Sequence, residues 1–83
     1  MPSATARVND AMVSVETIVG DVPWHAHDDE DKFFYVVDGR FVVELPERVV
    51  ELLRRQSFMV PKGVRHRTYA TEPLVVMVGN TPS

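Results

Sequence analysis

The chain has 83 residues, of which 45% are apolar and 25% charged, with a net charge of −3 and no cysteine. This length predicts one small domain with a marginally stable core. Dimerisation is a common way to stabilise such a domain. With a pI near 5.5 the chain lacks the excess of positive charge that is typical of nucleic-acid-binding proteins. The lack of cysteine excludes disulfides and thiolate metal sites. No membrane span or signal peptide is visible, so we expect a soluble, cytoplasmic protein that binds neither nucleic acid nor membranes.

Alternation of apolar and polar residues predicts strands throughout the chain. The first ten residues are expected to form a flexible arm or a partial strand, followed by a single domain over residues 11–83. The strands are predicted at residues 12–19, 32–38, 40–45, 48–53, 57–60, 65–70 and 74–79. Short strands at such regular spacing indicate an all-β sandwich or barrel.

Turn residues separate the predicted strands. Asp38-Gly39 is a hairpin signal between two apolar runs, and Pro46-Glu47 can form a tight turn. Pro61-Lys62-Gly63 and Glu72-Pro73 are expected to break the later strands. A short helix over residues 47–56 is the main alternative, because Glu, Leu and Arg favour helices, whereas Val49-Val50 favours a strand.

The histidines are the candidate metal ligands. His25 and His27 are two residues apart, so their side chains point to the same side if this segment is extended, as Pro23 favours. His66 opens the strand after the Pro61-Lys62-Gly63 turn. An accidental pair in a surface loop is the plain alternative, but three imidazoles with an open position form a catalytic type of metal set.

These residues resemble the motifs of the cupin family. The first cupin motif reads Gly, five residues, His-x-His, three or four residues, Glu, six residues, Gly, and here His25, His27 and Gly39 match it. The second motif contains Pro-x-Gly, two residues and His, which Pro61, Gly63 and His66 match. The resemblance covers about residues 20–70.

The resemblance implies a small antiparallel, jelly-roll-like β-barrel of about seven or eight short strands. It also implies that His25, His27 and His66 hold a divalent transition metal, such as Zn, Ni, Fe, Mn or Cu, beside a small polar ligand. Family members include isomerases, dioxygenases, sugar-binding sensors and metal-free storage proteins, so the fold does not name a reaction.

Several positions depart from the family pattern. Four residues separate Gly20 from His25 rather than five, Arg55 occupies the leading Gly of the second motif, and Ala70 replaces its terminal Asn. The Arg55 position favours φ > 0, so the turn over residues 54–56 is either strained or differently shaped. The largest departure is Lys32, which stands at the Glu ligand position.

If the family register holds, Lys32 faces the cavity together with residues 34 and 36, while residues 33, 35 and 37 face outward. Its ammonium would oppose a metal by about 4 kcal/mol per unit charge at 4 Å and an effective dielectric near 20. Lys32 can instead extend to the barrel mouth, or Glu30 can enter the metal site in its place. Alternatively, Lys32 binds an anion or takes part in acid/base chemistry.

Other side chains have less specific roles. Trp24 could line the ligand pocket or pack in the core or a dimer interface. Met12, Met59 and Met77 are expected in the core. An apolar subunit interface is predicted at Phe33, Tyr35, Val37, Val42 and Val50. Arg65 and Arg67 should lie on the face opposite His66, in solvent or in ion pairs.

Two functions remain open from the sequence. The chain is either a small metal-dependent enzyme in which Lys32 orients the substrate, or a non-catalytic binding or sensor domain with a metal-poor site in which Lys32 binds an anion. Both predict a small-molecule ligand and a homodimer.

Overall fold

The regular elements are all strands in the computed structural model, which describes residues 4–8 and 11–82. They are β1 (Ala4–Val8), β2 (Ala11–His25), β3 (Glu30–Asp38), β4 (Phe41–Glu44), β5 (Val49–Leu52), β6 (Ser57–Val60) and β7 (His66–Pro82). Within these ranges, no helix is long and apolar enough to cross a membrane. The all-β prediction is confirmed, and the helix considered for residues 47–56 is wrong, because β5 and a turn occupy this segment.

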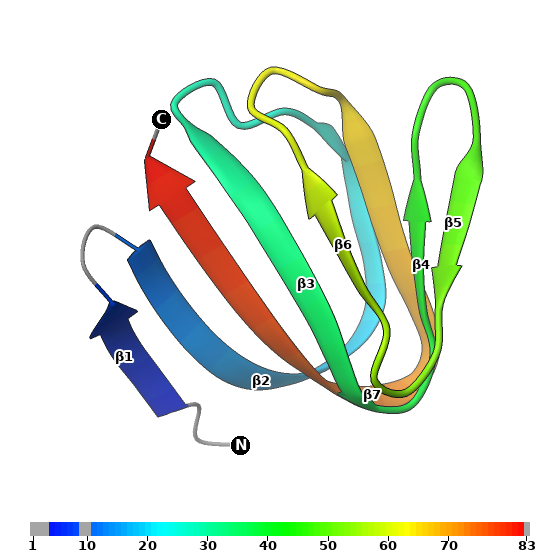
Figure 1. Cartoon of the computed structure of the whole chain (residues 1–83). Coiled ribbons are helices and arrows are strands. Elements are labelled where there is room, and N and C mark those ends of the chain that lie inside the picture. Colours follow the sequence, from blue (N-terminus) through cyan, green and yellow to red (C-terminus); the bar gives the residue numbers. More distant parts are fainter. Residues whose placement is uncertain (1–3, 9–10, 83) are drawn as a thin grey trace.

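The strands form one antiparallel sheet that curls into a barrel (Figure 1). Its main path runs β1-β2-β7-β3-β6, and β4 pairs with both β5 and β7. The long strand β7 is the common partner, since it pairs with β2 along most of its length, with β3 at its C-terminal half and with β4 near its start. The beginning of β7 and the end of β2 therefore meet at one edge of the barrel, where His25 pairs with His66.

β7 is one bent strand rather than the two predicted strands separated by Glu72-Pro73. Pro73 lies between the stretch that pairs with β4 and the stretch that pairs with β3. Opposite it, the register of β2 shifts between Ile18 and Gly20, and Gly20 has φ +100°. Because proline has no N–H to donate, it is tolerated at such an irregular position and bends the strand without ending it.

The predicted hairpin at Asp38-Gly39 is also wrong in detail. Gly39 does reverse the chain with φ +114°, but β3 and β4 do not pair, and each instead pairs with a different half of β7. A Cβ at Gly39 would lie 2.7 Å from Cβ of Leu74, so the turn packs directly on the bend of β7. By contrast, the turn at Pro46-Glu47 does join a paired hairpin, β4 and β5.

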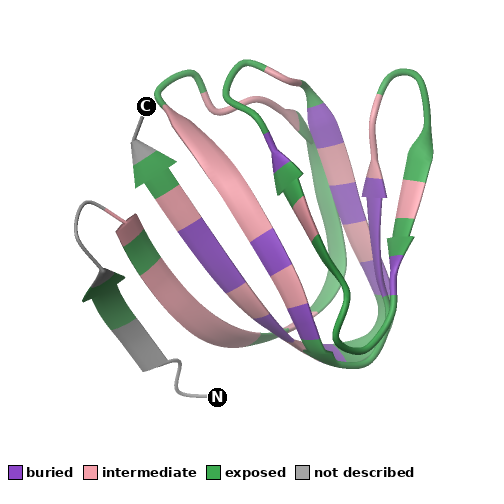
Figure 2. Cartoon of the chain, viewed as in Figure 1, coloured by how far each residue is buried: buried purple, intermediate pink, exposed green. Residues whose placement is uncertain are grey.

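The core follows the period of two expected for strands (Figure 2). Inward side chains of several strands form one apolar cluster: Phe34, Val36, Phe41, Val43, Leu52, Val60, Ala70, Leu74, Val76 and Val78. Lys32 precedes Phe34 and Val36 on the same face, as the sequence predicts. The core thus fills one end of the barrel and leaves the histidine end to polar groups.

The predicted outer patch and methionine core are partly wrong. Val42 is only 3% exposed, and Val50 packs against the core, so neither contributes to an outer surface. Met59 is 51% exposed and lies opposite Phe33, which places it on the outer face instead of in the core. Met12 is also exposed.

Candidate metal centre

The three histidines converge at one edge of the barrel. His25 ends β2, His66 begins β7, and the two are direct cross-strand partners. His27 lies two residues beyond His25, and its carbonyl accepts a 2.7 Å hydrogen bond from the N–H of Gly63. This bond ties the loop after β2 to the Pro61-Lys62-Gly63 turn, so both histidine segments are held together. One ligand atom from each imidazole lies within 4.8 Å of the others.

Backbone carbonyls orient two of the imidazoles. Nδ1 of His25 lies 2.8 Å from the carbonyl oxygen of Pro23, and Nδ1 of His66 lies 3.0 Å from that of Val64. Because a carbonyl oxygen only accepts, each Nδ1 carries the proton and each Nε2 is left with a lone pair. Such a carbonyl contact on the second ring nitrogen is the usual way to fix a metal-ligating histidine.

The Nε2 atoms provide a direct test of whether these residues suit a metal ion. Nε2 of His66 is buried without a hydrogen-bond partner, in a residue only 1% exposed. Nε2 of His25 lies 3.1 Å from Nε2 of His27, so these two potential ligand atoms are already close together. A buried acceptor without a donor is costly, and a cation at this point would satisfy it. The donor set therefore fits a divalent transition metal.

The electrostatic environment favours neutral imidazoles. Burial lowers the pKa of His27 below its ordinary value of 6.5, and the Lys32 charge lowers it further. Burial also lowers the pKa of His66, against the opposing effect of its hydrogen bond to Val64. Histidine must be neutral to ligate a metal, so both shifts extend the pH range over which the cluster can bind one.

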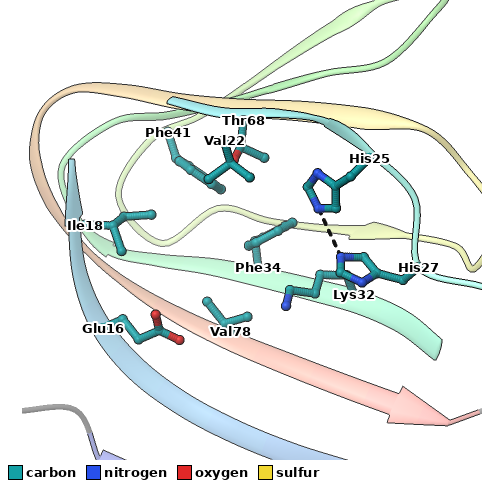
Figure 3. A pocket seen from close by; sticks show the side chains of 10 residues that line it. All are labelled: Glu16, Ile18, Val22, His25, His27, Lys32, Phe34, Phe41, Thr68 and Val78. Atoms are coloured by element: carbon teal, nitrogen blue, oxygen red, sulfur yellow. Dashed lines mark hydrogen bonds between the residues drawn. The ribbon is translucent and has the colours of Figure 1, made fainter. Parts of the chain in front are cut away.

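A cavity of about 180 Å³ adjoins the histidines (Figure 3). Its walls come from several strands: Glu16, Ile18, Val22, His25, His27, Lys32, Phe34, Phe41, Thr68 and Val78. In Figure 3 His25 and His27 occupy one end, and mainly apolar side chains line the remainder. This arrangement of convergent polar groups over an apolar floor is typical of a small-molecule site.

Lys32 lines this cavity beside the histidines, and its side chain extends into it (Figure 3). The prediction that Lys32 shares the inner face of β3 with Phe34 is therefore correct. Glu30 does not join the histidines, because the ligand cluster in the described residues contains only His25, His27 and His66. In the acidic loop, Asp28 and Asp29 are exposed, and Asp31 accepts a 2.9 Å hydrogen bond from the N–H of Lys62.

Sequence reasoning missed two polar residues of the cavity, Glu16 and Thr68. Glu16 accepts a 2.8 Å hydrogen bond from the Ser14 hydroxyl and faces the cavity from β2. The sequence does hold one indication of this: Glu16 lies two residues before Ile18, so the charged and the apolar side chain share one face of the strand. Thr68 shares the face of His66 two residues further along β7.

The neighbouring aromatic and basic residues lie outside the cavity. Trp24 is 38% exposed and does not line it, and the Arg65 guanidinium lies 5.9 Å from the centre of the Trp24 ring. Arg67 faces away from His66, as predicted, and forms ion pairs with Glu44 at 2.9 Å and Asp21 at 3.3 Å. These contacts support the β2, β4 and β7 edge from outside.

The fold and cluster define a class of small β-barrel domains with an internal three-histidine group that could hold a metal. A family model described as a cupin domain matches residues 13–79, most of the chain. The chain belongs to the cupin family.

Two curated proteins are similar to the chain in sequence. The uncharacterized protein YdbB of Bacillus subtilis is 33% identical over 64 residues, or 76% of this chain and 57% of YdbB. The tetracenomycin polyketide synthase protein TcmJ of Streptomyces glaucescens is 31% identical over 80% of this chain and 45% of TcmJ. The chain therefore spans about half the length of these curated relatives.

A crystal structure of a cupin-2 domain containing protein from Shewanella frigidimarina is similar to the whole chain. It superposes with a TM-score of 0.88 at 26% identity, covering 99% of this chain and 80% of that one.

Proposed function

We propose that His25, His27 and His66 bind a divalent transition metal and that the adjoining cavity binds a small polar or anionic molecule. The buried, unpartnered Nε2 of His66 is the observation that carries this proposal, since a cation is the group that would satisfy it. A metal bound here would act as a Lewis acid toward the ligand. Whether the ligand reacts or is only sensed depends on its identity.

Lys32 is proposed to orient the ligand. Its ammonium lines the same cavity as His25 and His27, so an anionic group beside it gains charge-assisted hydrogen bonds from Lys32. The alternative function is a non-catalytic binding domain in which Lys32 alone holds the anion and no metal is retained. The absence of a carboxylate from the described histidine cluster favours this alternative.

A zinc titration against a competing chelator tests the proposal. The chelator-stripped protein should bind one Zn²⁺, and His66→Ala should weaken binding by at least tenfold, about 1.4 kcal/mol. Arg65→Ala is the control, because Arg65 neighbours His66 but lies outside the cavity. Equal zinc affinity of the parent protein and His66→Ala would contradict the metal site and leave the anion-binding alternative.

We also propose that the chain forms a homodimer through its outer sheet face. On the side away from the core, Phe33 is the cross-strand partner of Met59, and Tyr35 is the cross-strand partner of Met77. Covering these apolar side chains with a second copy would add to the small core of a single chain.

A further inference from the structure

The charges around the cavity are unbalanced at the histidine end. The three imidazoles bring no negative charge, and Lys32 adds a positive one on the adjoining wall. Among the described lining residues, only Glu16 is acidic, and Figure 3 places it across the cavity from His25 and His27. A metal in the proposed site would therefore raise the positive charge where the described residues offer no anionic ligand.

We infer that the ligand itself supplies the missing carboxylate. It is a monocarboxylate with an apolar body, whose head lies between Lys32 and the three histidines. This inference rests on the proposed metal site and goes further, since it names the ligand class and makes the binding of metal and ligand mutually dependent. Lys32, which opposes a metal alone, becomes favourable once the carboxylate lies beside it.

The remainder of the cavity selects the body of the ligand. Ile18, Phe34 and Val78 present apolar surface beyond the Lys32 ammonium (Figure 3). The cavity of about 180 Å³ slightly exceeds the roughly 150 Å³ that holds a benzene molecule in an apolar protein cavity. A ring or short branched chain therefore fits, and its burial adds to the affinity of the charged head.

Glu16 excludes a second negative charge. Its carboxylate, fixed by the Ser14 hydroxyl, faces the cavity on the side opposite the histidines. A ligand with carboxylates at both ends would place its second charge toward this like charge. Monocarboxylates should thus bind better than dicarboxylates of the same shape.

Cobalt titrations with and without benzoate test the inference, because the visible spectrum of Co²⁺ reports binding without any activity. Benzoate should tighten Co²⁺ binding at least tenfold, and Co²⁺ should tighten benzoate binding by the same factor, as linkage requires. Acetate, which has the head without the apolar body, and benzamide, which has no charge, should each give a smaller effect.

Variants assign the effect to residues. Lys32→Met should bind Co²⁺ alone more tightly but lose most of the benzoate effect, and Lys32→Gln should behave in the same way. Lys62→Met is the matched control, since it removes the same charge from an exposed turn outside the cavity. Terephthalate should bind the parent protein more weakly than benzoate, and Glu16→Gln should reduce this difference, whereas Glu72→Gln should not.

The outcomes separate this inference from the proposed function. If Co²⁺ binds in a His66-dependent manner but benzoate changes its affinity less than twofold, the inference is wrong and the metal site stands. If Co²⁺ fails to bind with or without benzoate, both are wrong. If the parent protein binds terephthalate as tightly as benzoate, Glu16 does not select the ligand charge, and that part of the inference is wrong.

Discussion

Lys32 stands on the cavity wall where the cupin motif carries a glutamate, and its charge acts on the histidines. It lowers the pKa of His27, second to burial, and is the smallest of the effects that lower the pKa of His66. The same side chain thus favours the neutral form of these two imidazoles and opposes a cation between the histidines. Its net effect on metal binding depends on whether an anion accompanies the metal.

Lys32→Glu should therefore raise the affinity for Zn²⁺ in the absence of other ligands. The substitution removes a repulsion of several kcal/mol and supplies an oxygen donor, so an increase of at least tenfold is expected. Competitive chelation measures the change, with Lys62→Glu as the control for net charge. An unchanged affinity would mean that position 32 lies outside the coordination sphere.

The lowered pKa values of His27 and His66 predict loss of stability in weak acid. As the pH falls below the ordinary value of 6.5, the unfolded chain takes up protons that the folded chain does not. The free energy of unfolding should therefore decrease until the lowered pKa values are passed. Urea unfolding of metal-free protein from about pH 7.5 to 5.5 measures this slope, which His66→Gln should reduce. A parent protein with constant stability over this range would refute the prediction.

At the scale of strands and turns, the alternating pattern predicted the strands well but not their continuity. β7 runs through Glu72-Pro73 because the partner strands change there, and no local signal in the sequence shows which strands will pair. The Asp38-Gly39 turn was misread as a hairpin for the same reason. Strand pairing is set by long-range packing, such as the contact of Gly39 with Leu74.

The motif predicts that the turn over residues 54–56 is either strained or differently shaped, and the structure shows the strained form at Arg55. Arg55 has φ +71°, while its N–H donates a 2.7 Å hydrogen bond to the carbonyl of Val36. The bond holds the turn against β3 although a side chain at this φ costs about 1–2 kcal/mol.

Arg55→Gly should consequently raise the free energy of unfolding by roughly 0.5–1 kcal/mol, after the higher entropy of glycine in the unfolded chain is counted. Chemical denaturation measures the change. Arg54→Gly is the control, because Arg54 has no positive φ, and it should be neutral or destabilising. Equal effects of the two substitutions would show that Arg55 is not strained.

At the scale of the whole molecule, the outer face leaves apolar side chains exposed. The proposed dimer predicts a mass of twice the 9.4 kDa of one chain in light scattering. Met59→Glu should yield monomers, because it places a charge on this face beside Phe33, while Val49→Glu at an exposed position of β5 should not. A monomeric parent protein at micromolar concentration would contradict the proposed interface.

The site itself was predicted in part. The two motifs identified His25, His27 and His66, since their spacing is local and the fold only had to bring two segments together. Glu16 and Thr68 carry no such spacing, and they reach the cavity through the long antiparallel pairing of β2 with β7. The proposed ligand class rests on Lys32 and Glu16 lining one cavity, which no local pattern in the sequence indicates.

The most direct test of the account is elemental analysis of tag-free protein purified without added metal or chelator, beside His66→Ala. The parent protein should contain close to one equivalent of a transition metal per chain, which the variant loses because one of three donors is gone. Absence of metal from both proteins would contradict the metal site and leave the alternative of an anion pocket or an empty cavity.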